Sequence, residues 1–155
     1  MLKRRSYSVL LVALTMLMSV LTISCKKDST CGVPHGIGGT IDLSLPQYYS
    51  LGTVGGGMMI EQDADSIYMG HRGIYVVRTS AQSEFLAFEC SCPKDHDVAV
   101  RPVDGWGSSL LQCPRCNSIF SLYADGTPVE GSATPCSLYQ YATVMDNDGY
   151  HLHIY

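Results

Sequence analysis

Charged side chains are scarce in this sequence, and basic ones are the scarcest. Only 15% of the 155 residues are Asp, Glu, Lys or Arg, and the 14 acidic residues outnumber the 10 basic ones. Three of the ten basic residues, Lys3, Arg4 and Arg5, lie at the N-terminus, so seven remain beyond it against all fourteen acidic ones. Binding of phosphate groups needs a basic surface. The composition therefore argues against nucleic acid as a partner.

A sustained helical pattern is also absent after residue 24. No segment repeats apolar residues at the spacing of an amphipathic helix. Short apolar or alternating runs are instead separated by turns, in a chain with 15 glycines and 7 prolines. These runs predict strands at 40–45, 58–60, 74–77, 85–88, 98–101, 110–112, 119–122, 141–145 and 150–155. We therefore predict an all-β domain over residues 40–155, a small antiparallel barrel or sandwich with two cysteine-bearing loops.

Catalytic signatures are missing as well. The sequence has no nucleophile–base arrangement, no paired-carboxylate motif and no phosphate-binding glycine loop. His151 and His153 alternate on the last predicted strand, where an exposed polar face is a better interpretation than a metal pair. Trp106, the single tryptophan, is expected to cover the cysteine region or the core. We therefore expect no catalytic activity from this chain itself.

The N-terminus has the layout of an export signal. Its basic residues precede an apolar run from residue 9 to 23 that is short for a membrane span. The run ends in Leu21-Thr-Ile-Ser-Cys25, which resembles the lipobox of bacterial lipoproteins. We predict a lipoprotein signal peptide over 1–24, acylation of Cys25 and a lipidated tether over 25–39. The alternatives are an ordinary cleaved signal or an uncleaved anchor. The predicted location is the cell envelope, outside the cytoplasm, with the lipid anchor in the membrane.

Cysteine is concentrated in one region. Four of the seven cysteines lie in Cys90-Ser-Cys92 and Cys113-Pro-Arg-Cys116. Thiolates at these spacings can converge on one metal centre, so these four are the predicted metal-binding and cofactor-binding residues, with His96 as a spare ligand. An iron–sulfur cluster, a zinc ion and disulfides all fit the pattern. A disulfide between Cys31 and Cys136 would attach the tether to the domain, although the sequence does not establish their distance.

Residues 40–155 resemble Rieske domains, small all-β modules that hold a [2Fe–2S] cluster between two loops. The segment Cys113-Pro-Arg-Cys116-Asn-Ser-Ile-Phe120 looks like the second ligand loop of that family, which reads Cys-Pro-x-His-Gly-x-x-Phe. Asn117 stands where the family has a glycine that often needs a positive φ, a conformation that asparagine tolerates. Further similarities are Gly73–Val77 and Phe85–Phe88 before the first loop and, after the second, Asp125-Gly126, Gly131-Ser-Ala133, Leu138 and Tyr141.

Both histidine ligands of the family are absent from this sequence. Cys116 occupies the histidine position of the second loop, and two registers fit the first loop. If Cys90 is the first ligand, Cys92 replaces the histidine. If Cys92 is the first ligand, Lys94 stands in its place. An all-cysteine cluster carries more negative charge than one with two imidazoles, so we expect a lower, ferredoxin-like potential that does not depend on pH.

Taken with the resemblance, these residues predict a lipid-anchored domain that binds a [2Fe–2S] cluster through Cys90, Cys92, Cys113 and Cys116. Such a domain would transfer electrons to a redox protein partner. The alternative is a structural or binding domain of the same fold that is cross-linked by zinc or disulfides and has no redox activity. A third possibility is a redox-responsive thiol pair at the CxC or CxxC motif.

Overall fold

The structure is a computed structural model that describes residues 31–80, 84–105 and 107–155. The predicted signal peptide, Cys25 and Trp106 lie outside the described residues. Within the described part of the chain, no helix has the length and apolar character needed to cross a membrane.

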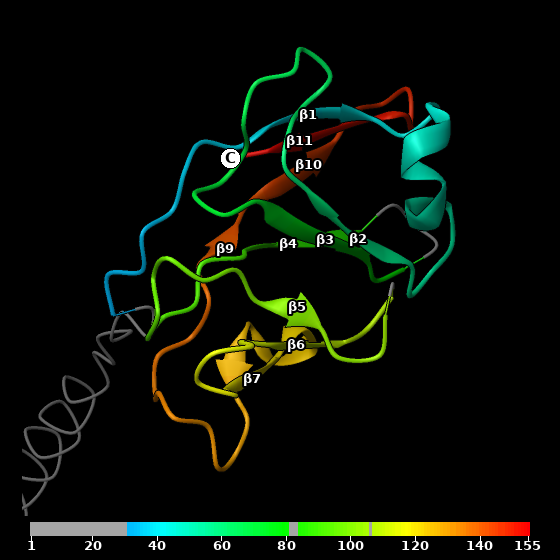
Figure 1. Ribbon diagram of the computed structural model, residues 1–155. Coiled ribbons are helices and arrows are strands. Elements are labelled where there is room, and N and C mark those ends of the chain that lie inside the picture. The colour runs from blue at the N-terminus through cyan, green and yellow to red at the C-terminus, as the bar shows by residue number, and fades with distance from the viewer. Residues whose placement is uncertain (1–30, 81–83, 106) are drawn as a thin grey trace, which may run out of the picture.

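The strands of the described residues form three open antiparallel sheets that lie one above another (Figure 1). The first sheet has the order β1 (Gly39–Asp42), β11 (His151–Ile154), β10 (Thr143–Met145). The second has the order β2 (Gly57–Ile60), β3 (Ile74–Arg78), β4 (Phe85–Glu89), β9 (Gln140–Tyr141). The third has the order β5 (Arg101–Pro102), β6 (Leu110–Gln112), β7 (Ile119–Ser121), β8 (Thr127–Pro128). The predicted all-β class is confirmed, as a layered arrangement without a closed barrel.

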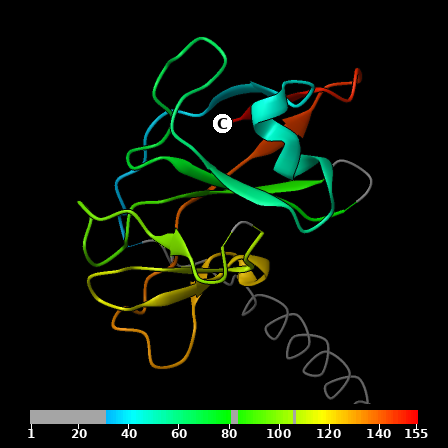
Figure 2. The same cartoon turned by 45° about the vertical axis from the view of Figure 1, so that its right-hand side comes forward.

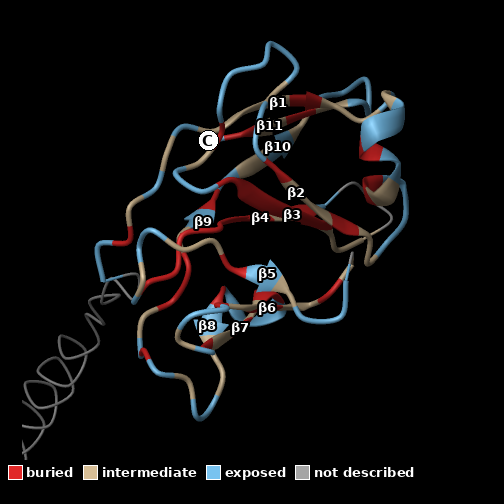
Figure 3. Cartoon of the chain, in the orientation of Figure 1, coloured by how far each residue is buried: buried red, intermediate tan, exposed pale blue. Residues whose placement is uncertain are grey.

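The second sheet is the middle layer, and its strand β3 is buried on both faces (Figure 3). Because side chains alternate along a strand, Ile74 and Val76 join one core cluster while Tyr75 and Val77 join the other. The first cluster is shared with the β1–β11–β10 sheet, and the second with the β5–β8 sheet. The second view shows the same order of layers (Figure 2). A strand between two apolar cores explains the uninterrupted apolar run of β3.

Most predicted strands are observed with slightly different ends. The segment predicted as a strand over 98–101 is mostly loop, with an isolated bridge between Ser91 and Ala99 before β5 begins. The sequence did not predict the 3₁₀-helix η1 (Pro46–Gly52), which is too short for a helical stripe. It buries Tyr48 and Leu51, which lie one 3₁₀ turn apart. A second such helix, η2 (Leu122–Ala124), follows β7.

Residues 31–39, which the sequence assigned to the tether, run along the folded domain. A disulfide joins Cys31 to Cys136. The Val33 side chain is buried, and the backbone N–H of Gly70 donates to the carbonyl oxygen of Ile37. The packed part of the chain therefore includes this stretch, because the disulfide and the backbone hydrogen bond both hold it there.

The order of the third sheet explains why the two cysteine stretches meet. Strands β5 and β6 are antiparallel, with Arg101 opposite Gln112. The chain that enters β5 and the chain that leaves β6 therefore lie at the same end of the sheet. The first of these segments is the loop over 90–100, and the second is the loop over 113–118. Antiparallel pairing thus brings together cysteines that are about twenty residues apart in the sequence.

Candidate metal centre

Three of the four predicted cysteine ligands come together, and an aspartate joins them. One ligand atom from each of Cys92, Asp95, Cys113 and Cys116 lies within 4.8 Å of all the others. The Sγ atoms of Cys92 and Cys116 are 3.6 Å apart, and the Cys113 thiol is 3.6 Å from the Asp95 Oδ2 atom. Three sulfur atoms and one carboxylate oxygen therefore form a compact group that could hold a metal ion.

Cys90 and His96 are not part of this four-residue group. Cys90 directly follows β4 and is fully buried in the core cluster between the second and third sheets. Its surroundings raise the thiol pKa, chiefly because burial disfavours the charged form. The His96 side chain lies 3.0 Å from the carbonyl oxygen of Pro93, within its own loop. Both registers considered for the first loop use Cys92 as a ligand. The structure brings Cys92, but not Cys90, to the cysteines of the second loop.

The sequence interpretation missed Asp95. A signal for it exists in the spacing, because Cys92-x-x-Asp95 repeats the interval of Cys113-x-x-Cys116. Residues three apart in a tight loop can both point to one ion, as in zinc knuckles. Each loop thus contributes two ligand atoms at the same spacing.

The pKa values of Cys92 and Cys116 shift in opposite directions. Burial, with hydrogen bonding to the thiols of Cys113 and Cys116, raises the pKa of Cys92 to about 12. Burial also acts on Cys116, but hydrogen bonds from Ser118 and from the neighbouring thiols outweigh it and lower the pKa of that thiol. A metal ion requires the thiolate form, so its positive charge would have to displace the proton of Cys92.

Backbone conformation fixes the second loop. Asn117 has φ of 59°, which confirms the predicted positive φ at this position. A hydrogen bond from the N–H of Asn117 to the carbonyl oxygen of Cys113 closes the turn. The N–H of Cys113 donates to the carbonyl oxygen of Ser118. The buried Ser118 hydroxyl lies 3.2 Å from the Cys116 Sγ atom and accepts the N–H of Ala133 at 3.0 Å. The loop over 131–133 thus supports the second cysteine loop from outside.

An ion pair links the two cysteine loops at the surface. The guanidinium of Arg115, which lies between Cys113 and Cys116, donates two hydrogen bonds to the Asp97 carboxylate, at 2.7 and 3.1 Å. This contact lowers the pKa of Asp97. Both side chains are exposed, so solvent screens the pair and its main effect is on loop geometry.

A buried glutamate lies directly behind the first loop. Glu89 is fully buried, and its carboxylate accepts hydrogen bonds from six groups. Oε1 accepts the N–H of Arg72 and both the N–H and hydroxyl of Ser91, while Oε2 accepts the N–H groups of Gly36 and His71 and the Tyr141 hydroxyl. Because Ser91 stands between Cys90 and Cys92, this carboxylate positions the start of the first cysteine loop.

A second, exposed group of candidate ligands lies at the β10–β11 turn. Asp146, Asp148 and His151 are close enough to hold an ion. Their contacts are also those of ordinary ion pairs: His151 contacts Asp148, and the Nε2 atom of His153 lies 3.1 Å from Asp146. Both histidines are half-buried, and each contacts an aspartate of the β10–β11 turn.

The His151–Asp148 pair should be visible in a pH titration. Asp148 raises the pKa of His151 through a hydrogen bond and its charge. Because the folded-state pKa is raised, the histidine stabilises the fold below its ordinary pKa of about 6.5, and this effect disappears as pH rises through the raised value. NMR titration should give a His151 midpoint above 6.5 that falls in the Asp148→Asn variant. Asp65→Asn, a remote exposed change, should leave it unaltered. An unchanged midpoint in Asp148→Asn would contradict the assignment.

Comparison of the chain with models of protein families finds no match, and comparison with curated proteins finds none either. Functional conclusions therefore depend on the geometry and chemistry of the residues described above.

Proposed function

We propose that the two loops hold a single tetrahedral metal ion, with zinc as the best fit, through Cys92, Asp95, Cys113 and Cys116. In this proposal the chain is a structural or binding domain of Rieske-like fold whose two cysteine loops are cross-linked by the metal ion. Four protein ligands would fill the coordination sphere of zinc and leave no open position for a substrate, which is the arrangement of structural zinc sites.

The mutual distances of the ligand atoms carry this proposal. With zinc–sulfur bonds of about 2.3 Å, the ligands of a tetrahedral ion lie about 3.8 Å apart. The Cys92–Cys116 sulfur separation of 3.6 Å agrees with this value, and no pair of the four ligand atoms exceeds 4.8 Å. A two-iron cluster places its ligands in two pairs on opposite sides of an iron–sulfide core. Four mutually close ligand atoms therefore favour one ion.

The chemistry and spacing of the ligands support the same conclusion. Iron–sulfur clusters are held mainly by thiolates, whereas zinc also accepts carboxylate oxygen. Residues 96–112, a stretch of 17, separate Asp95 from Cys113. The ligands therefore follow the zinc-site pattern of two CxxC pairs about 15–20 residues apart, with Asp95 in place of one cysteine.

A lipid-anchored electron carrier with a [2Fe–2S] cluster is the second candidate. It is supported by the resemblance to Rieske ligand loops and by the hydroxyl of Ser118 beside Cys116, since hydrogen bonds to sulfur tune cluster potentials. Its fourth ligand would have to come from Asp95 or from movement of Cys90. The carrier would also need a redox protein partner.

The proposed location is the cell envelope, with acylated Cys25 in the membrane. The disulfide between Cys31 and Cys136 supports an oxidising compartment, because such bonds persist mainly outside the cytoplasm. It would also place the anchored segment directly against the folded domain.

Metal analysis combined with visible absorption tests the proposal. Protein purified without oxygen is expected to contain one zinc ion per chain and to be colourless. Visible absorption bands together with an EPR signal after reduction would replace this proposal with the electron carrier. A metal-free protein with a disulfide between Cys92 and Cys116 would overturn both.

A further inference from the structure

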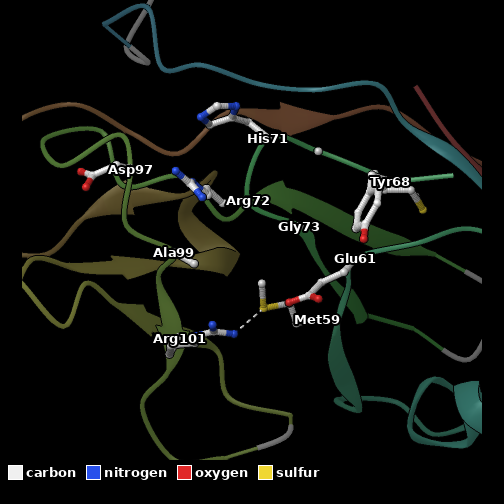
Figure 4. A pocket seen from close by; sticks show the side chains of 11 residues that line it. Met59, Glu61, Tyr68, His71, Arg72, Gly73, Asp97, Ala99 and Arg101 are labelled. Carbon is white, nitrogen blue, oxygen red and sulfur yellow. Dashed lines mark hydrogen bonds between the residues drawn. The ribbon is translucent and has the colours of Figure 1, made fainter.

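A cavity of about 460 Å³ lies beside the first cysteine loop but contains none of the four candidate ligands. One wall comes from the loop leading into β5, where the alternating residues Asp97, Ala99 and Arg101 face the cavity. The other comes from Met59 and Glu61, at the end of β2 and just after it, and from the turn over 68–73. Figure 4 shows Arg72, Ala99 and Arg101 along one side, with Tyr68 and Glu61 across from them.

Among the described residues, neither arginine of this cavity forms an ion pair with a carboxylate, although the charge of Arg72 contributes to lowering the pKa of Asp97. The Arg72 guanidinium takes part in none of the hydrogen bonds or ion pairs found there. The Arg101 guanidinium contacts only the sulfur of Met59, at 2.8 Å, and thioether sulfur is a weak acceptor (Figure 4). Guanidinium groups in a concave site normally bind carboxylate or phosphate oxygens. Both arginines are exposed, so an anion that enters the cavity can reach them without first breaking an ion pair.

The remaining charges limit what that anion can be. Asp97 also lines the cavity, but its carboxylate is held by both nitrogen atoms of the Arg115 fork. Glu61 has no ion-pair partner in the part of the chain that the structure describes. Among Arg72, Arg101 and Glu61, two guanidinium groups against one carboxylate leave a surplus of one positive charge. That surplus suits a singly charged anion better than phosphate, which Glu61 would repel more strongly.

We propose that this cavity binds a small organic monocarboxylate. The carboxylate would lie on the arginine side, against the fork of Arg72 or Arg101. Its apolar part would contact the thioether of Met59, which touches Arg101, and the aromatic ring of Tyr68 across the cavity (Figure 4). Ligand sites commonly combine an apolar lining with a few well-placed charges. The proposal does not depend on which ion the cysteine loops hold.

Benzoate is a suitable probe because it joins a planar carboxylate to an aromatic ring. The full-length protein is titrated with sodium benzoate, with the neutral isostere benzamide and with inorganic phosphate, and binding is followed by amide shifts in NMR spectra. Saturable benzoate shifts at His71, Arg72 and Ala99 are expected, with at least tenfold weaker binding of benzamide and of phosphate. Arg72→Gln and Arg101→Gln should each weaken benzoate binding about tenfold, since each removes a charge-assisted hydrogen-bond donor.

Two further variants make the test specific. Glu61→Gln removes the unpaired negative charge and should strengthen benzoate binding. Lys94→Gln removes a cation outside the cavity and should change binding by less than about twofold. The proposal is overturned if benzoate does not saturate, if benzamide or phosphate binds equally well, or if Lys94→Gln weakens binding as much as the arginine variants. Weaker binding in Glu61→Gln would also overturn it, because the site would then recognise a zwitterion.

Discussion

Replacing Cys113 with serine is expected to lower the affinity of the protein for the proposed metal ion more than about 100-fold. Cys113 is fully buried between the two loops, and its thiol lies 3.6 Å from the Asp95 carboxylate. Serine keeps the size of the side chain but replaces a thiolate by a hydroxyl that stays protonated at neutral pH. Competition with a chromophoric chelator measures the affinity, and metal analysis measures the amount retained after dialysis.

The matched control for this prediction is Cys90→Ala. Cys90 is equally buried but lies outside the group of four ligand atoms, so its replacement should leave metal affinity within about threefold. Loss of metal in Cys90→Ala together with retention in Cys92→Ala would reverse the register assigned to the first loop. If the Cys113→Ser variant retained metal at full affinity, the proposal that Cys113 is a metal ligand would be contradicted.

The substitution Glu89→Gln is expected to lower the free energy of unfolding by about 3–5 kcal/mol. Each carboxylate oxygen of Glu89 accepts three hydrogen bonds in a fully buried position. An amide keeps the shape, but its NH₂ group would face three donors and leave them unsatisfied. Urea unfolding followed by circular dichroism measures the change.

Two comparisons make the glutamate prediction specific. Tyr141→Phe removes only one of the six donors, the hydroxyl at 2.8 Å from Oε2, and should cost about 1–3 kcal/mol. Glu130→Gln changes an exposed glutamate and should alter stability by less than about 0.5 kcal/mol. A loss below 1 kcal/mol in Glu89→Gln would show that the buried carboxylate is not needed to hold the surrounding segments.

Local sequence determined the strands and several turns of this protein. Alternation and apolar runs predict strands because they reflect which side chains face a core, as in Ile74–Val77. Asn117 and Asp125 adopt the positive φ expected of such residues in turns. The sequence also identified the two cysteine stretches, since ligand spacing is a local property of the chain.

Tertiary structure decided which side chains form the candidate centre. Cys90 and Cys92 are two residues apart. Cys90 directly follows β4 in the core, and the pairing of β5 with β6 brings the loop that carries Cys92 to the second loop. Asp95 becomes a candidate ligand for the same reason. A local pattern cannot report these contacts, because each depends on the path of a segment about twenty residues away.

Glu89 shows the same limit in the core. By composition alone a glutamate is expected at the surface, and burial of its charge would be unfavourable without partners. Its donors come from residues 36, 71–72, 91 and 141, which lie on separate segments around the end of β4 and come together only in the folded chain. The sequence by itself determined most strands, several turns and the two cysteine stretches. The folded chain alone decided which thiols, carboxylates and guanidinium groups face one another, because hydrogen bonds and metal ligation depend on distances between remote segments.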